Sequence, residues 1–118
     1  MKLNLVRSFK LSEQALKTFC ADKSNVKTVE TVAVTLAQTF RNGNKVLICG
    51  NGGSSCDAMH FAEECVVKLR KDRKALPAIA LSETSYLLAA GNDYGFEHVF
   101  ARAVEAYGKP GDMLIAIS

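Results

Sequence analysis

The stretch Lys45-Val-Leu-Ile-Cys-Gly-Asn-Gly-Gly-Ser-Ser-Cys-Asp-Ala-Met-His-Phe-Ala-Glu-Glu64 decides the fold. Its beginning is a short, mostly apolar run, which indicates a buried strand over 45–49. The glycine-rich segment 50–54 then leads into a helical pattern, which we expect to run from about Ser54 to Arg70. A glycine-rich turn between a strand and a helix can bring backbone N–H groups close to a phosphate. The stretch therefore predicts a strand–loop–helix unit with a candidate anion-binding turn.

The turn over 50–54 matches neither of two familiar nucleotide-binding patterns. It lacks the spacing of GxGxxG, and its final glycine is not followed by Lys and then Ser or Thr, as in the Walker loop. A plain connection between a strand and a helix therefore stays open as an interpretation of the turn taken alone.

The helix expected after this turn has a polar stripe and an apolar stripe. At about 100° per residue, the polar stripe consists of Asp57, His60, Glu64 and Lys68, and the apolar stripe of Ala58, Ala62, Cys65 and Leu69. Residues four apart are neighbours on a helix, so His60 and Glu64 can ligate one divalent metal or share a proton in catalysis. An exposed ion pair is the alternative. A place beyond a phosphate-binding turn, in the crevice at the carboxyl end of a strand, favours the functional interpretation.

Composition limits the class of protein and its partners. The 118 residues are 48% hydrophobic and 23% charged, as in an ordinary soluble globular domain. The net charge of +3 is mild, and its one cluster over 68–74 reads as a solvated helix end, so we expect an anionic metabolite and no nucleic acid. No apolar run reaches the length of about 18 residues that a membrane span needs, and we expect no membrane partner and no secretory signal.

The four cysteines are not spaced as CxxC pairs, which argues against a structural zinc site made of thiolates. Cys49 lies in a strand pattern and Cys65 on the apolar stripe. Both read as buried, reduced thiols, which suits a cytoplasmic location.

Hydrophobic periodicity predicts the remaining elements. The first helix is expected over 3–21, and the second runs from a cap at Ser24 or Asn25 to a stop at Asn42-Gly43. Two later helices are expected, one from a cap at Ser82 to Gly91-Asn-Asp93 and one over 96–107. Strands are expected over 78–81 and 113–117, with a turn over 108–112. Apolar strands that alternate with helices indicate an α/β fold, with a parallel sheet flanked by helices on both faces.

We expect 1–118 to belong to a single domain, with N-terminal helices over 1–43 and the sheet and the site over 44–118. Only three strands are predicted, and no helix follows the last one. A doubly wound sheet normally has more strands and a further covering helix. The residues are therefore expected to be the N-terminal part of a larger domain, or to be completed by a partner.

The residues from Cys49 to Glu64 resemble the signature of the phosphoheptose isomerase family, part of the sugar-isomerase, or SIS, superfamily. The agreement continues through 77–82, 90–96 and 111–118, and so covers essentially the whole chain. The resemblance implies a three-layer, flavodoxin-like fold and a homotetramer with sites at subunit interfaces. It also implies conversion of sedoheptulose 7-phosphate to D-glycero-D-manno-heptose 7-phosphate, the first step toward the heptose of bacterial lipopolysaccharide core.

The resemblance further implies what the site residues do. One zinc ion per subunit would be held by His60 and Glu64, with further ligands from beyond Ser118, and Glu64 would be the catalytic acid/base carboxylate. The residues expected to contact the sugar phosphate are Asn51, Gly52, Gly53, Ser54, Lys68, Asp93 and Ser118.

Some features of the chain depart from the family pattern. Lys68 stands where an arginine that approaches the substrate is common, which keeps the charge but loses bidentate geometry. Ser55 stands where histidine is common. The family's downstream catalytic histidine, a glutamine metal ligand and most of the phosphate loop are not among the 118 residues. His98 does not match the missing histidine, and we interpret it as structural.

Two alternatives to the isomerase remain open. The first is a non-enzymatic SIS protein that binds a replication initiator or a sugar phosphate; such relatives usually lack the acidic pair that Glu63 and Glu64 provide. The second is an inactive, truncated fragment of the isomerase. The helix over 3–21 is expected to pack its apolar surface against a neighbouring subunit, with ordinary core packing within the chain as the other possibility.

Overall fold

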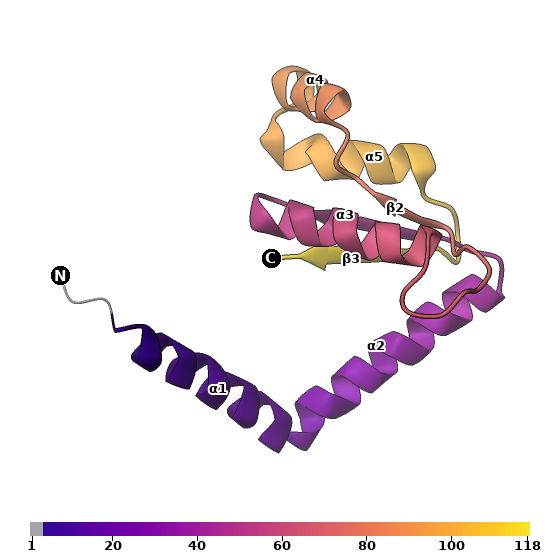
Figure 1. The fold of residues 1–118 in the computed structure, drawn as a ribbon. Helices are drawn as coiled ribbons and strands as arrows, with labels where there is room; N and C mark the ends of the chain where they lie inside the picture. The colour runs from indigo at the N-terminus through magenta and orange to yellow at the C-terminus, as the bar shows by residue number, and fades with distance from the viewer. Residues whose placement is uncertain (1–3) are drawn as a thin grey trace. The chain divides into compact units, whose positions relative to one another are not determined.

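The computed structural model describes residues 4–118, which form two compact units (Figure 1). The first unit ends at Thr35, and the second is Leu36–Ser118. Helix α1 spans Leu5–Ala21 and helix α2 spans Lys23–Arg41, so α2 begins in the first unit and ends in the second. The expected start of the first helix at residue 3 lies outside the described residues.

Asp22 separates α1 from α2. Its carboxylate accepts hydrogen bonds from the hydroxyl of Ser24 at 2.7 Å and from the backbone N–H of Ser24 at 2.8 Å. These bonds lower the pKa of Asp22, because they favour the charged carboxylate. The prediction that Ser24 or Asn25 caps the second helix is therefore wrong, and Asp22 is the cap.

Three parallel strands form the sheet of the second unit. Strand β1 is Val46–Gly50, β2 is Ala78–Ala80 and β3 is Met113–Ile117, in the order β2-β1-β3. Because β2 and β3 lie on opposite sides of β1, the carboxyl ends of β1 and β3 form a switch point in the topology. Ligands of open α/β sheets bind at such points.

Helices cover both faces of this sheet, which confirms the predicted fold class (Figure 1). Alternate residues of β1 point to opposite faces. On one face, Val46 and Ile48 pack with Ala58 and Ala62 of α3, which spans Gly53–Val66. On the other face, Leu47 and Cys49 pack in a cluster with Leu81 and with Ala103 of α5, which spans Val99–Tyr107.

Two helices differ from their predicted bounds. Helix α3 ends at Val66 and not near Arg70, and the chain then has no regular structure up to Pro77. Helix α4 spans Thr84–Tyr94, so it continues past the predicted stop at 91–93.

Two helix starts also differ. The cap of α4 is Glu83 and not Ser82, since the Glu83 carboxylate accepts from the backbone N–H groups of Ser85 and Tyr86 at 3.0 and 2.8 Å. The helix predicted over 96–107 is divided into a short 3₁₀ helix η1, Phe96–His98, and α5.

The amino ends of β1 and β3 are joined through Asp112. Its carboxylate accepts from the backbone N–H of Lys45 at 3.0 Å and that of Lys109 at 2.8 Å, and it forms an ion pair with the Lys45 ammonium. These contacts lower the pKa of Asp112, chiefly through the backbone hydrogen bond from Lys45. The predicted turn over 108–112 is thereby fixed to the start of the central strand.

Candidate functional site

The glycine turn brings the end of β1 very close to the first turn of α3. A Cβ atom on Gly50 would lie 2.7 Å from both the Cβ and the carbonyl oxygen of Ser54. Gly52, at φ 53° and ψ −124°, precedes α3 in a conformation that side-chain-bearing residues rarely adopt. The local sequence therefore needs glycine at both positions to make this turn.

The start of α3 has no side-chain cap. The N–H groups of Ser54 and Ser55 bond to the carbonyls of Asn51 and Gly52, at 3.0 and 3.1 Å. Within residues 4–118, the N–H groups of Gly52 and Gly53 make no backbone hydrogen bond of this kind. Gly52 and Gly53 therefore offer backbone N–H groups for an anion in this turn.

A cavity of about 320 Å³ lies at the switch point between β1 and β3. Its lining residues are Cys49, Gly50, Asn51, Ser54, Phe100, Ala116, Ile117 and Ser118. Three of the predicted substrate contacts, Asn51, Ser54 and Ser118, are thus brought together although Ser118 is far from the others in sequence. A polar rim of hydroxyl and amide groups in a crevice of this kind suits a phosphorylated ligand.

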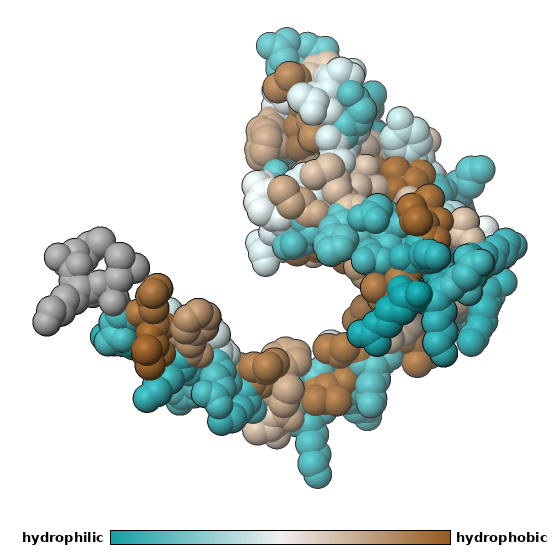
Figure 2. Space-filling view, in the orientation of Figure 1, coloured by the Kyte–Doolittle hydropathy of each residue, from teal (hydrophilic) through white to brown (hydrophobic). Residues whose placement is uncertain are grey.

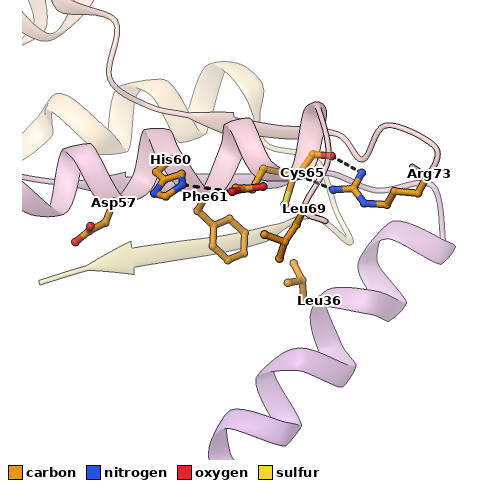
Figure 3. Close-up of a pocket in the computed structure, with 8 residues that line it drawn as sticks. Leu36, Asp57, His60, Phe61, Cys65, Leu69 and Arg73 are labelled. Carbon is orange, nitrogen blue, oxygen red and sulfur yellow. Dashed lines mark hydrogen bonds and ion pairs between the residues drawn. The ribbon is translucent and has the colours of Figure 1, made fainter. Parts of the chain in front are cut away.

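His60 and Glu64 lie in a different cavity, of about 650 Å³ (Figure 3). Its lining residues are Leu36, Asp57, His60, Phe61, Glu64, Cys65, Leu69 and Arg73. His60 Nε2 is 3.4 Å from Glu64 Oε1, and the Glu64 side chain is 31% exposed against 71% for His60. The predicted juxtaposition of the two side chains is confirmed, and their chemical roles remain predictions.

The separation of this pair fits two ligands of one metal ion. Tetrahedral zinc, with bonds of about 2.0–2.1 Å, places two ligand atoms about 3.4 Å apart. Among residues 4–118, no group of three or more His, Cys, Asp and Glu side chains could hold a metal. His60 and Glu64 therefore fit as part of a zinc site, whose remaining ligands would come from outside the described residues.

The glycine turn and the His60–Glu64 pair do not share one crevice, contrary to the sequence-based expectation. Helix α3 starts at the carboxyl end of the sheet and runs back toward its amino end (Figure 1). At 1.5 Å per residue, Glu64 is about 16 Å along the helix from Gly53. The cavity at the turn contains neither His60 nor Glu64.

Lys68 and Asp93 lie outside both cavities. Lys68 is exposed and follows the end of α3, so its predicted place on the polar stripe of the helix is wrong. Asp93 is exposed in the last turn of α4 and accepts a hydrogen bond from the Asn92 side chain at 2.8 Å. Within residues 4–118, neither Lys68 nor Asp93 therefore lines a cavity with the other predicted site residues.

Sequence reasoning missed Arg73, which lines the cavity of His60 and Glu64. Its guanidinium donates to the carbonyl oxygens of Cys65, at 2.7 Å, and of Glu64. Basic residues are common at helix ends, and this signal was available. From the sequence, Arg73 was expected to belong to a solvated helix end, because it lies in the charged cluster over 68–74.

A family model described as the SIS domain matches residues 12–118. The chain belongs to the SIS domain family. Among curated SIS relatives, the phosphoheptose isomerase of Fusobacterium nucleatum subsp. nucleatum is 52% identical over 98% of this chain and 60% of its own length. The phosphoheptose isomerase of Enterobacter sp. is 48% identical over 100% of this chain and 62% of its own length. This SIS chain thus spans about 60% of the curated relatives that it matches.

Two solved structures of phosphoheptose isomerases are also similar to nearly all of this SIS chain. A phosphoheptose isomerase from Neisseria gonorrhoeae superimposes with a TM-score of 0.86 at 40% identity, over 97% of this chain and 59% of that one. One from Francisella tularensis gives a TM-score of 0.81 at 30% identity, over 98% of this chain and 62% of the other. Within the described part of this SIS chain, no helix combines the length and apolarity needed to cross a membrane.

Proposed function

We propose that the protein containing these residues converts sedoheptulose 7-phosphate to D-glycero-D-manno-heptose 7-phosphate, in the cytoplasm, as a step toward lipopolysaccharide heptose. The observation that carries the proposal is the 52% identity with a phosphoheptose isomerase over 98% of the chain. The acidic pair Glu63-Glu64, placed directly after His60-Phe-Ala, supports the enzyme over the non-enzymatic SIS alternative.

Glu64 is the residue proposed to move the proton. A ketose becomes an aldose when a proton leaves C1, an enediol forms, and a proton returns to C2. The Glu64 carboxylate lies in a cavity whose lining includes the apolar side chains of Leu36, Phe61 and Leu69, and it is mostly shielded from solvent. A shielded carboxylate beside an imidazole suits both halves of this transfer.

His60 and Glu64 are also proposed to provide two ligands for a zinc ion. When bound, zinc would supply electrostatic polarisation of the sugar oxygens at C1 and C2. A carboxylate that binds a metal is a weaker base, so the ligand and base roles of Glu64 are assigned to different states of the site. The side chain of His60 is 71% exposed, so it is accessible both to a zinc ion and to the substrate.

The phosphate group is proposed to bind at the glycine turn, with Asn51, Ser54 and Ser118 around it. Since Glu64 lies about 16 Å along α3 from the turn, one chain does not bring the two ends of a site together. A homo-oligomer, proposed as a tetramer with sites between subunits, would join a turn and an acidic pair from different copies.

The N-terminal unit supports this assembly. Described by itself, α1 has no buried side chain, and Figure 2 shows hydrophobic side chains at the surface of the N-terminal helices. Leu5, Phe9 and Leu16 of α1 are 60%, 73% and 65% exposed. Apolar side chains on this scale are typical of a surface that another chain covers.

The test compares Glu64→Gln with Glu63→Gln in the full-length protein. Glu63 is the adjacent, exposed carboxylate and does not line the cavity. We expect Glu64→Gln to reduce kcat by about 10²–10⁴-fold, because general acid–base catalysis contributes that much. Glu63→Gln should leave kcat within about twofold. Product is measured as the heptose phosphate formed from sedoheptulose 7-phosphate.

Near-normal turnover by Glu64→Gln would remove this carboxylate from the mechanism. A full-length wild-type protein that forms no heptose phosphate, contains no zinc and binds a protein partner would overturn the proposed function. In that case the non-enzymatic alternative would be preferred.

A further inference from the structure

Arg73 links the irregular segment after α3 back to the last turn of that helix. Its guanidinium donates to the carbonyl oxygens of Cys65 at 2.7 Å and Lys74 at 2.9 Å, and to the carbonyl of Glu64. The dashed lines in Figure 3 follow the bonds from Arg73 to α3. One side chain thus binds the main chain of the residue whose carboxylate is the proposed base.

Without Arg73, the carbonyl of Glu64 would lack a partner, and that of Cys65 would keep only the N–H of Leu76. In a longer helix they would accept from the N–H groups of Lys68 and Leu69, but the chain leaves the helix at Val67, at φ −85° and ψ −84°. Arg73 replaces the first of these donors. Arg73 and the backbone N–H of Leu76, at 3.0 Å from the Cys65 oxygen, replace the second.

We propose that Arg73 is a positioning residue, which holds the Glu64 carboxylate beside His60 by fixing the main chain of Glu64. This inference rests on the function proposed above. The terminal turn of a helix frays unless its carbonyls are bound, and Glu64 lies in that turn. A displacement of about 1 Å at a catalytic group can cost about 100-fold in rate.

The chemistry of arginine suits this task better than that of lysine. The positive charge interacts favourably with the negative end of the helix dipole. The planar guanidinium fork binds two neighbouring carbonyls at once, whereas an ammonium group is a single, flexible point charge. A lysine at position 73 should therefore restore the electrostatic part of the interaction and only some of the positioning.

The experiment uses Arg73→Gln and Arg73→Lys in the full-length protein, with Arg70→Gln as the matched control. Arg70 is exposed on the same segment and lines neither cavity. For Arg73→Gln we expect the dissociation constant for zinc to rise about 10–100-fold, as for other residues that orient metal ligands. We also expect kcat to fall by a similar factor, with KM for the sugar phosphate within about threefold. Arg73→Lys should fall between wild type and Arg73→Gln.

Hydrogen–deuterium exchange adds a measurement that needs neither zinc nor activity. Amides of the last turn of α3, around 62–67, should exchange about tenfold faster in Arg73→Gln and should be unchanged in Arg70→Gln. If Arg73→Gln does not fold, the same measurements on Arg73→Lys decide the question.

Unchanged zinc affinity and unchanged exchange at the end of α3 would overturn the inference, even if the melting temperature fell. A lower melting temperature alone would indicate a structural role. If wild-type protein neither binds zinc nor forms heptose phosphate, the proposed function fails by itself, and faster exchange around 62–67 would still support Arg73 as the residue that fixes this turn.

Discussion

The two ends of strands β1 and β3 are built in opposite ways. At their amino ends, the Asp112 carboxylate accepts hydrogen bonds from the backbone N–H groups of Lys45 and Lys109. At their carboxyl ends, the chain turns through glycines, and α3 begins without a side-chain cap beside a cavity of about 320 Å³. Backbone donors therefore remain for a ligand at the end where the protein's own side chains do not bind them.

The largest expected effect comes from Gly50→Ala at the carboxyl end. The added Cβ would lie 2.7 Å from the Ser54 carbonyl oxygen, so either β1 or α3 must move. We expect a loss of about 3 kcal/mol in the free energy of unfolding, at the upper end of the usual cost of overpacking. Urea denaturation of the full-length protein measures it.

Gly53→Ala is the control for this prediction. A Cβ at Gly53 would meet no atom within 4 Å, and its φ is not positive. We expect a change within about 0.5 kcal/mol. If Gly50→Ala and Gly53→Ala lost the same free energy of unfolding, the close approach of β1 to α3 would not be the reason that position 50 needs glycine.

A smaller effect is expected from Ser54→Ala, which tests whether the carboxyl end of the sheet binds the phosphate. The Ser54 side chain is half-buried beside the cavity at the switch point. Loss of one hydrogen bond to a charged phosphate should raise KM about tenfold and leave kcat within about threefold. The measurement is steady-state kinetics with sedoheptulose 7-phosphate.

Ser55→Ala serves as its control, since Ser55 is half-buried in the same helical turn but lines neither cavity. An equal rise in KM for both variants would place the phosphate somewhere other than this cavity.

The smallest expected effect is at the amino end, in the pH dependence of stability. Hydrogen bonds from Lys45 hold the pKa of Asp112 below its ordinary value. A carboxylate with a lowered pKa in the folded state stabilises the protein above its unfolded pKa of about 3.9, and this contribution is lost as pH falls further. Asp112→Asn keeps the shape but removes the charge, so its stability should fall less steeply below about pH 4. Urea denaturation from pH 3 to pH 7 checks this, and identical slopes would contradict it.

The sheet and its covering helices could be predicted from local patterns. The continuous apolar runs around 46–49 and 113–117 identify strands, which pair in the predicted parallel sense. Only the first is buried, because the side chains of β3 are half-buried or exposed. The helical spacing of His60 and Glu64 likewise predicted their contact correctly. These features depend on neighbours within a few residues, and such information is carried by the sequence itself.

The end of α3 could not be predicted in the same way. The periodic pattern continues through Lys68 and Leu69, but the chain leaves the helix at Val67, and Arg73 and Leu76 bind the freed carbonyls from a later segment that the local pattern does not include. The starts of α2 and α4 differ from the prediction for a local reason. Acidic side chains at Asp22 and Glu83 took the capping positions that serine was expected to occupy.

The distance between the two candidate cavities could also not be read from the stretch 45–64. The glycine turn is close to His60 and Glu64 in the sequence. In the structure they are separated along the axis of α3, because each helical residue adds about 1.5 Å. The contact of Ser118 with the same cavity as Asn51 depends on the strand order, which places β3 beside β1.

The three-stranded sheet has a practical consequence. Within residues 4–118, β2 and β3 each pair only with β1, so each has one side whose N–H and C=O groups face no other strand. Such edges recruit strands from other molecules and promote aggregation. These 118 residues, expressed by themselves, are therefore expected to self-associate through sheet edges, and a dilute refolding assay with light scattering would detect it.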